Sequence, residues 1–181
     1  MEIGATKAVQ DRLKTTKIEE SKGASLVFCW DTHLTKIKGR NVLFIVNASN
    51  RYTIAMTDIE PRNWNYYTMY IRSVIHGVMQ EMGYSEDQIG QYFKMSGDTT
   101  VTKTHGRKSV GGINRMVMDA QYFGKKLEKE AKYQWELSEY LNRDICQPEG
   151  FDAYGYPSEL FKLDMERLGI AAKRKPAKVI D

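Results

Sequence analysis

The 181-residue sequence predicts an α+β fold: a small, mostly antiparallel β-sheet (a meander) packed by helices, with a helical C-terminal extension. Residues 42–46 are apolar at every position, which is typical of a strand covered on both faces. Residues 52–56 form a second run of mainly β-branched and aromatic residues, and the turn formers between the runs predict a β-hairpin. From Pro61 onward, apolar residues recur every three to four positions, which is the period of an α-helix.

Shorter elements precede the hairpin. Residues 2–6 fit a first edge strand, and residues 7–14 fit a short helix with one apolar stripe. A polar loop is expected over 15–25. Residues 26–37 alternate between apolar and polar side chains, which predicts a half-buried strand. Joined to the hairpin by a turn at 38–40, this strand completes the antiparallel meander.

Helical periodicity dominates the rest of the chain. An amphipathic helix is predicted over 61–83, and a shorter helix with acids in its first turn over 85–95. Residues 98–104 are rich in Thr and Val, which predicts a fourth strand. A long helical pattern covers 106–141, and one more short helix covers 158–168.

Glycine residues mark boundaries within the long helical pattern. In a helix, each residue of the pair Gly111-Gly112 lowers helix stability by roughly 1 kcal/mol relative to Ala, so we expect the helix to begin after this pair. A break is expected near Gly124. Residues 1–123 then form an α+β core domain, and residues 124–181 form a helical extension that ends in a basic tail.

Composition indicates a soluble globular protein. The chain has 41% hydrophobic residues and a net charge of +4, a mild bias that permits a polyanionic partner without requiring one. No apolar run is long enough for a secretion signal or a membrane span. Cys29 and Cys146 share no metal-ligand spacing, so we expect reduced thiols in the cytoplasm, no metal site and no cofactor.

A basic stretch marks the junction between the last predicted strand and the long helix. No acidic residue lies between Val101 and Met118. Lys103, Arg107 and Lys108 at this junction would hold an anionic group, helped by the free N–H groups at the start of the helix. A solvated turn whose charges only face water is the alternative.

Catalytic patterns are weak in this sequence. The phosphate-binding motif G-x-x-x-x-G-K-[ST] does not occur. Asp31 and His33 share one face of a predicted strand, but a metal site needs more ligands than this pair. Ser109 follows His105 by four residues, which suits a nucleophile and its base, yet no third group is placed beside them. We therefore assign no catalytic residue.

Aromatic residues are dense in the extension. They would either cover the long helix or form a surface for a protein partner or for a homodimer, because Tyr and Trp anchor interfaces. The candidate interface residues are Tyr133, Trp135, Tyr140, Phe151, Tyr154 and Tyr156.

Four short motifs, in this order and spacing, resemble the bacterial family DUF6933, a domain of unknown function, over residues 3–123. They are Ala5-Thr6-Lys7, Phe28-x-Trp30, Val46-Asn47…Arg51-Tyr52 and Thr102-Lys103-Thr104…Arg107-x-Ser109. Ala5 stands where the family is expected to have cysteine, so a thiol role at that position does not transfer. The resemblance implies a small cytoplasmic α+β module of bacteria and their mobile elements. Its recurring polar residues correspond to Thr6, Lys7, Asn47, Arg51, Lys103, Arg107 and Ser109, which would converge into one basic pocket.

The aromatic extension on such a module is similar to phage-encoded anti-CRISPR proteins that act on Cas9. The net charge of +4 departs from the strongly acidic type that imitates DNA. We therefore expect a non-enzymatic inhibitor that binds a Cas9–guide RNA complex, contacts nucleic-acid backbone and hinders DNA loading or cleavage. The candidate binding residues are Lys7, Arg51, Lys103, Arg107, Lys108, Ser109 and Arg115.

An enzyme or a ligand-binding module for a phosphorylated small molecule or a nucleic acid is the alternative function. It would use the basic residues as one closed pocket, whereas the inhibitor would present them on a flat surface.

Overall fold

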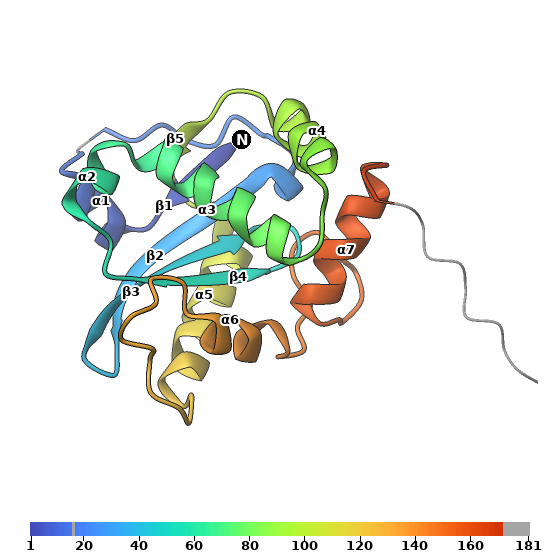
Figure 1. Cartoon of the computed structure of the whole chain (residues 1–181). Coiled ribbons are helices and arrows are strands. Elements are labelled where there is room, and N and C mark those ends of the chain that lie inside the picture. The colour runs from blue at the N-terminus through green and yellow to red at the C-terminus, as the bar shows by residue number, and fades with distance from the viewer. Residues whose placement is uncertain (16, 172–181) are drawn as a thin grey trace, which may run out of the picture.

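The computed structural model describes residues 1–15 and 17–171, and it has an α+β fold with one mixed sheet (Figure 1). The strand order is β4-β3-β2-β1-β5. The predicted meander is confirmed, because β2, β3 and β4 pair antiparallel. The strands are β1 (Glu2–Ala5), β2 (Cys29–Ile37), β3 (Arg40–Asn47), β4 (Thr53–Thr57) and β5 (Thr100–Thr102).

The expectation of a first edge strand is wrong. β1 lies between β2 and β5 and pairs parallel with both. Parallel neighbours need long crossover connections. Residues 6–28 connect β1 to β2, and residues 58–99 return the chain from β4 to β5 beside β1. Every residue of β1 is buried, because strands lie on both of its sides and helices cover the sheet.

The helices follow the predicted pattern with three corrections. They are α1 (Lys7–Leu13), α2 (Pro61–Asn65), α3 (Tyr67–Glu81), α4 (Glu86–Ser96), α5 (Gly106–Gln121), α6 (Trp135–Asn142) and α7 (Pro157–Arg167), with a 3₁₀ turn at Leu26–Phe28 before β2. The helix expected over 61–83 is broken at Tyr66, whose ψ of 41° is not helical. The break expected near Gly124 is present but longer than expected, because α5 ends at Gln121 and α6 begins only at Trp135.

Gly111 and Gly112 lie inside α5, so the expectation that the helix begins after them is wrong. Tertiary packing outweighs their low helix propensity, since Ile113, Met116 and Ala120 on the same helix are buried against the sheet.

Helices cover both faces of the sheet (Figure 1). On one face, side chains such as Ile3, Leu43 and Ile54 pack with α3, α4 and α7. On the other, Phe44 and Ala55 pack with α5 and α6. This explains the unbroken apolar run of β3, in which Val42–Val46 are all buried, as predicted.

The segment after residue 123 completes the sheet. The Ser138 hydroxyl accepts a hydrogen bond from the amide of Ala55 at 3.0 Å. The Asn142 side chain accepts from the amide of Thr53 at 2.8 Å and donates to its carbonyl at 2.7 Å. These bonds close the outer edge of β4, which would otherwise present unpaired backbone groups. The division into two domains at residue 123 stays a prediction.

Most of the predicted basic tail lies outside the described residues. Within 1–15 and 17–171, no helix combines the length and the apolar character needed to cross a membrane.

Candidate functional site

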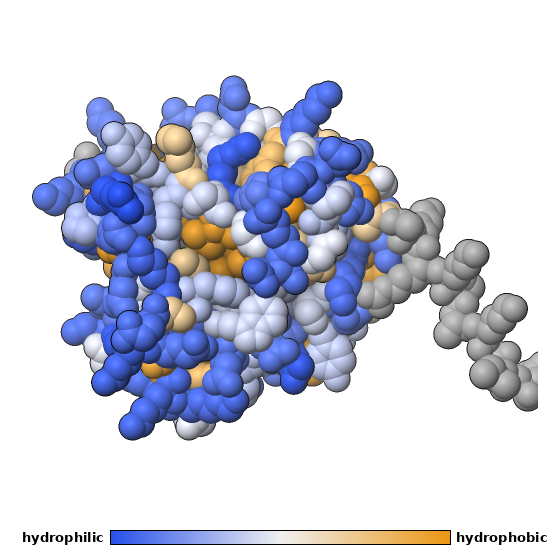
Figure 2. All heavy atoms as spheres, viewed as in Figure 1, coloured by the Kyte–Doolittle hydropathy of each residue, from blue (hydrophilic) through white to orange (hydrophobic). Residues whose placement is uncertain are grey.

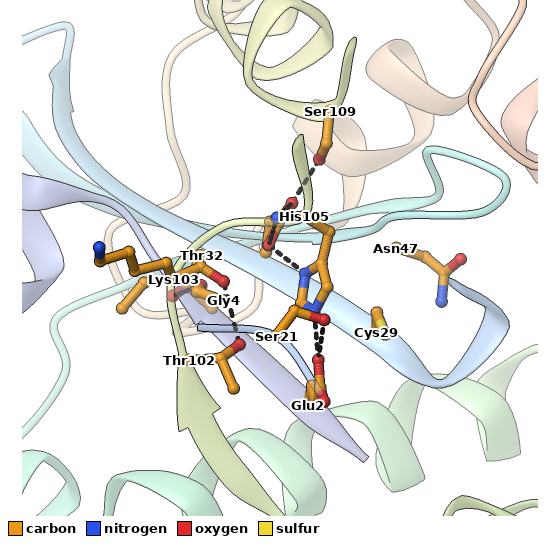
Figure 3. Close-up of polar contacts among 12 residues, drawn as sticks. Glu2, Gly4, Ser21, Cys29, Thr32, Asn47, Thr102, Lys103, His105 and Ser109 are labelled. Atoms are coloured by element: carbon orange, nitrogen blue, oxygen red, sulfur yellow. Dashed lines mark hydrogen bonds and ion pairs between the residues drawn. The ribbon is translucent and has the colours of Figure 1, made fainter. Parts of the chain in front are cut away.

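A buried polar network lies where β1, β2 and the start of α5 meet (Figure 3). Glu2 pairs with Cys29 and Gly4 with Asp31 across the parallel β1–β2 ladder, so these side chains share one face of the sheet. The loop after β5 crosses this face and lays His105 over it. The His105 side chain is only 2% exposed.

His105 lies between two carboxylates. Its Nδ1 lies 2.7 Å from Oδ1 of Asp31, and its Nε2 lies 3.0 Å from Oε2 of Glu2. Burial by itself lowers the pKa of His105, but the side-chain hydrogen bonds to Asp31 and Cys29 and the charges of these two groups outweigh burial and raise the pKa to about 10. The two flanking carboxylates therefore favour the imidazolium form of the ring.

Glu2 is held as a carboxylate. Its Oε2 accepts a hydrogen bond from the Ser21 hydroxyl at 2.6 Å, and its Oε1 accepts from the amide of Lys22 at 2.8 Å. Burial raises the pKa of Glu2, but these bonds and His105 more than offset that effect and lower the pKa.

Asp31 occupies the N-terminal end of α5. Its carboxylate accepts hydrogen bonds from the His105 amide, at 3.2 Å, and from the Ser109 hydroxyl. A carboxylate is favoured there by the helix dipole. The sequence predicted that an anionic ligand would bind at the start of this helix. In the structure, the carboxylate of Asp31 occupies that position instead. Ser109 binds Asp31 rather than His105, so the two do not form a nucleophile–base pair.

Gly4 makes room for this arrangement. A Cβ atom at Gly4 would lie 1.8 Å from Oδ1 of Asp31 and 3.0 Å from Cα of Thr104. Only glycine lets both the carboxylate and the crossing loop approach the strand.

The predicted basic residues do not gather in one pocket. Arg51, Lys108 and Ser109 line a single cavity of about 40 Å³, together with Asn47 and Glu149. The other four are exposed and lie elsewhere: Lys7 pairs with Asp11, Lys103 with Glu20 and Arg115 with Asp119, while Arg107 lies at the start of α5.

Arg51 is the least exposed of these cations. Its side chain is 17% exposed, and its ion pair with Asp144 is long, at 4.0 Å. The backbone of Arg51 is left-handed, with a φ of 64°. The stem of Arg51 lies beside Gly112, where an added Cβ would be 3.6 Å from its Cδ.

The predicted aromatic residues divide into two groups. Phe151 is buried beneath Arg167, whose guanidinium lies 3.9 Å from the ring centre, so it has a core role. The others reach the surface: Tyr133 is half-buried, and Trp135, Tyr140, Tyr154 and Tyr156 are between 43% and 70% exposed.

Tyr133 and Trp135 line a groove of about 350 Å³ together with Tyr52, Met82 and side chains of α6 and α7. We call this the aromatic groove. Figure 2 shows apolar surface on this side of the molecule, between α3 and α6.

Glu2 and His105 were missed as partners of Asp31. Sequence alternation did place Asp31 and His33 on one strand face, and this was the available signal. The distance in sequence hid the rest, because Glu2 belongs to a strand expected at the edge and His105 to the junction between a strand and a helix, 74 positions after Asp31.

Comparison with known proteins identifies one family. A family model described as "Domain of unknown function (DUF6933)" matches residues 2–160. No curated protein and no solved structure matches the chain. The match extends beyond residue 123, where the resemblance was expected to end, and it includes the whole of α6.

Proposed function

We propose that this chain, which belongs to the DUF6933 family, is a non-catalytic binding protein whose partner is another protein. The observation that carries the proposal is the aromatic groove. Trp135 is 43% exposed and meets Tyr133 edge to face, with ring centres 5.8 Å apart. Trp and Tyr that line a concave surface are the residues that most often anchor protein interfaces.

The charges around the aromatic groove also favour a protein partner. Arg143 pairs with Glu139 at 2.7 Å, and Lys162 pairs with Glu159 at 3.0 Å. Because both cations are already paired, the groove offers apolar contact within a balanced polar rim. This is the composition of a protein interface rather than of a site for a charged small molecule.

A Cas9-type nuclease with its guide RNA is the partner to test first. This choice rests on the resemblance of a small module with an aromatic extension to anti-CRISPR proteins. It also rests on exposed cations such as Arg107 and Lys108, which suit contact with a nucleic-acid backbone. Inhibition would be steric.

Size-exclusion chromatography at physiological salt, with and without guide RNA, tests the proposal. We expect co-elution with the guide-loaded nuclease, and Trp135→Ala should weaken it about tenfold or more, as for an interface anchor. Tyr122→Ala is the matched control, since Tyr122 is 79% exposed and does not line the groove. Failure to co-elute with several Cas9 orthologues would exclude this partner, and equal effects of the two variants would exclude the groove.

Arg51 favours a second candidate, a site for a small anion such as a phosphate group. A mostly buried guanidinium whose ion pair with Asp144 is as long as 4.0 Å is well placed to bind an anion, and about 40 Å³ accommodates a small polar group. We expect inorganic phosphate to raise the melting temperature of the protein but not of Arg51→Gln. Arg143→Gln, outside the cavity, should respond like the unaltered protein; equal responses of all three would exclude the site.

A further inference from the structure

We propose that Glu2, Cys29 and His105 form a binding site for a transition-metal ion, and that the ion is Zn²⁺. Their ligand atoms, a carboxylate oxygen, Sγ and a ring nitrogen, all lie within 4.8 Å of one another. All three side chains are buried. They come from β1, β2 and the link between β5 and α5, so one ion would join three separate parts of the chain (Figure 3).

The orientation of His105 is that of a metal ligand. Its Nδ1 is fixed by Asp31 at 2.7 Å, which leaves Nε2 directed at Glu2. In metalloproteins, the histidine nitrogen that does not bind the ion is commonly held by a carboxylate in this way. Ser21 and the amide of Lys22 fix the Glu2 carboxylate in the same manner.

The set of donor atoms selects the class of metal. One sulfur, one nitrogen and one oxygen suit Zn²⁺, whereas Ca²⁺ and Mg²⁺ prefer oxygen ligands alone. Zn²⁺ lies about 2.0–2.3 Å from each ligand. Glu2 Oε2 and His105 Nε2, now 3.0 Å apart, would need to separate only slightly to admit it.

Binding replaces protons with the ion and involves no redox step. The Cys29 thiol, which donates to the carbonyl of Ser25 at 3.4 Å, loses its proton, and His105 loses the proton on Nε2. Both protons leave to solvent, and the thiolate, the imidazole and the Glu2 carboxylate each give an electron pair to Zn²⁺.

Cobalt(II) substitution tests the site, because a thiolate bound to Co²⁺ gives a charge-transfer absorption band. The chain has only two cysteines, so in Cys146→Ser the thiol of Cys29 is the only one left. We expect the unaltered protein and Cys146→Ser to bind Co²⁺ stoichiometrically, both with the thiolate band, and Zn²⁺ to displace the cobalt. Cys29→Ser should lack the band.

Asp31 acts as a positioning residue, and its removal gives a second readout. Asp31→Asn should weaken Zn²⁺ binding by about 10- to 100-fold, the usual effect of losing such a partner. Mg²⁺ should not compete. If Cys146→Ser binds no Co²⁺, or binds it without the thiolate band, the proposal is overturned and the cluster is a network of hydrogen bonds only. This result does not depend on Cys29→Ser folding.

Discussion

The carboxylate of Asp31 and the imidazole of His105 meet at 2.7 Å although 74 residues separate them in the sequence. Through its other nitrogen, His105 also reaches Glu2 at 3.0 Å. The ring therefore connects β2 to β1 beneath the start of α5. Removing one partner of such a buried ion pair is strongly destabilising, because it leaves an uncompensated buried charge.

Replacing Asp31 by Ala should lower the free energy of unfolding by about 3–5 kcal/mol, because it leaves a buried imidazolium without its main counter-charge. Urea denaturation in the presence of a metal chelator measures this loss of unfolding free energy for the metal-free protein. Asp11→Ala is the control: Asp11 pairs with Lys7 in the open, with side chains 61% and 81% exposed, and its loss should change stability by less than about 1 kcal/mol. Similar losses in both variants would contradict the role given to Asp31.

Gly4→Ala should destabilise the fold by about 1–3 kcal/mol or more, because the new methyl group meets Asp31 and the backbone of Thr104. Gly90→Ala is the matched control. Gly90 lies in the interior of α4 with open space around it, so alanine there should stabilise by up to about 1 kcal/mol. Thermal unfolding of both variants checks the prediction, which fails if Gly4→Ala is neutral.

Ser138→Ala should cost about 1–3 kcal/mol, since it leaves the buried amide of Ala55 without an acceptor. Hydrogen exchange gives a local readout, because the Ala55 amide should exchange faster while the amide of Phe44 in β3 keeps its protection. An unchanged exchange rate at Ala55 would show that α6 does not close the edge of β4.

Asp164 should make stability depend on pH. It is 4% exposed, and burial raises the pKa of its carboxyl above the usual 3.8 although Asn50 donates a hydrogen bond to it. The folded chain thus binds this proton more tightly than the unfolded chain does. The contribution of Asp164 to stability is present below pH 3.8 and is lost as pH rises through the raised pKa.

Asp164→Asn, which cannot titrate, isolates this effect. The free energy of unfolding of the unaltered protein minus that of the variant should fall as pH rises over this interval and then level off. A difference that stays flat or rises with pH would contradict the assignment. Glu166→Gln, on the same helix, serves as the control for a charge change.

The sequence by itself determined the elements whose signals are local. The apolar run at 42–46 specified a strand buried on both faces, and Ser85 with Gln88 formed the capping box that opens α4. The resemblance to the DUF6933 family was also readable from the chain, and the family match confirms it. Such signals depend on the period of side chains and on hydrogen bonds between near neighbours.

Only the tertiary structure decided where distant segments meet. It placed β1 between β2 and β5, kept Gly111 and Gly112 inside α5, and separated Arg51 and Lys108 from the other predicted cations. It also brought Glu2, Asp31 and His105 together. Parallel pairing and buried ion pairs join residues through long loops, and their energies depend on burial that no short stretch of sequence encodes.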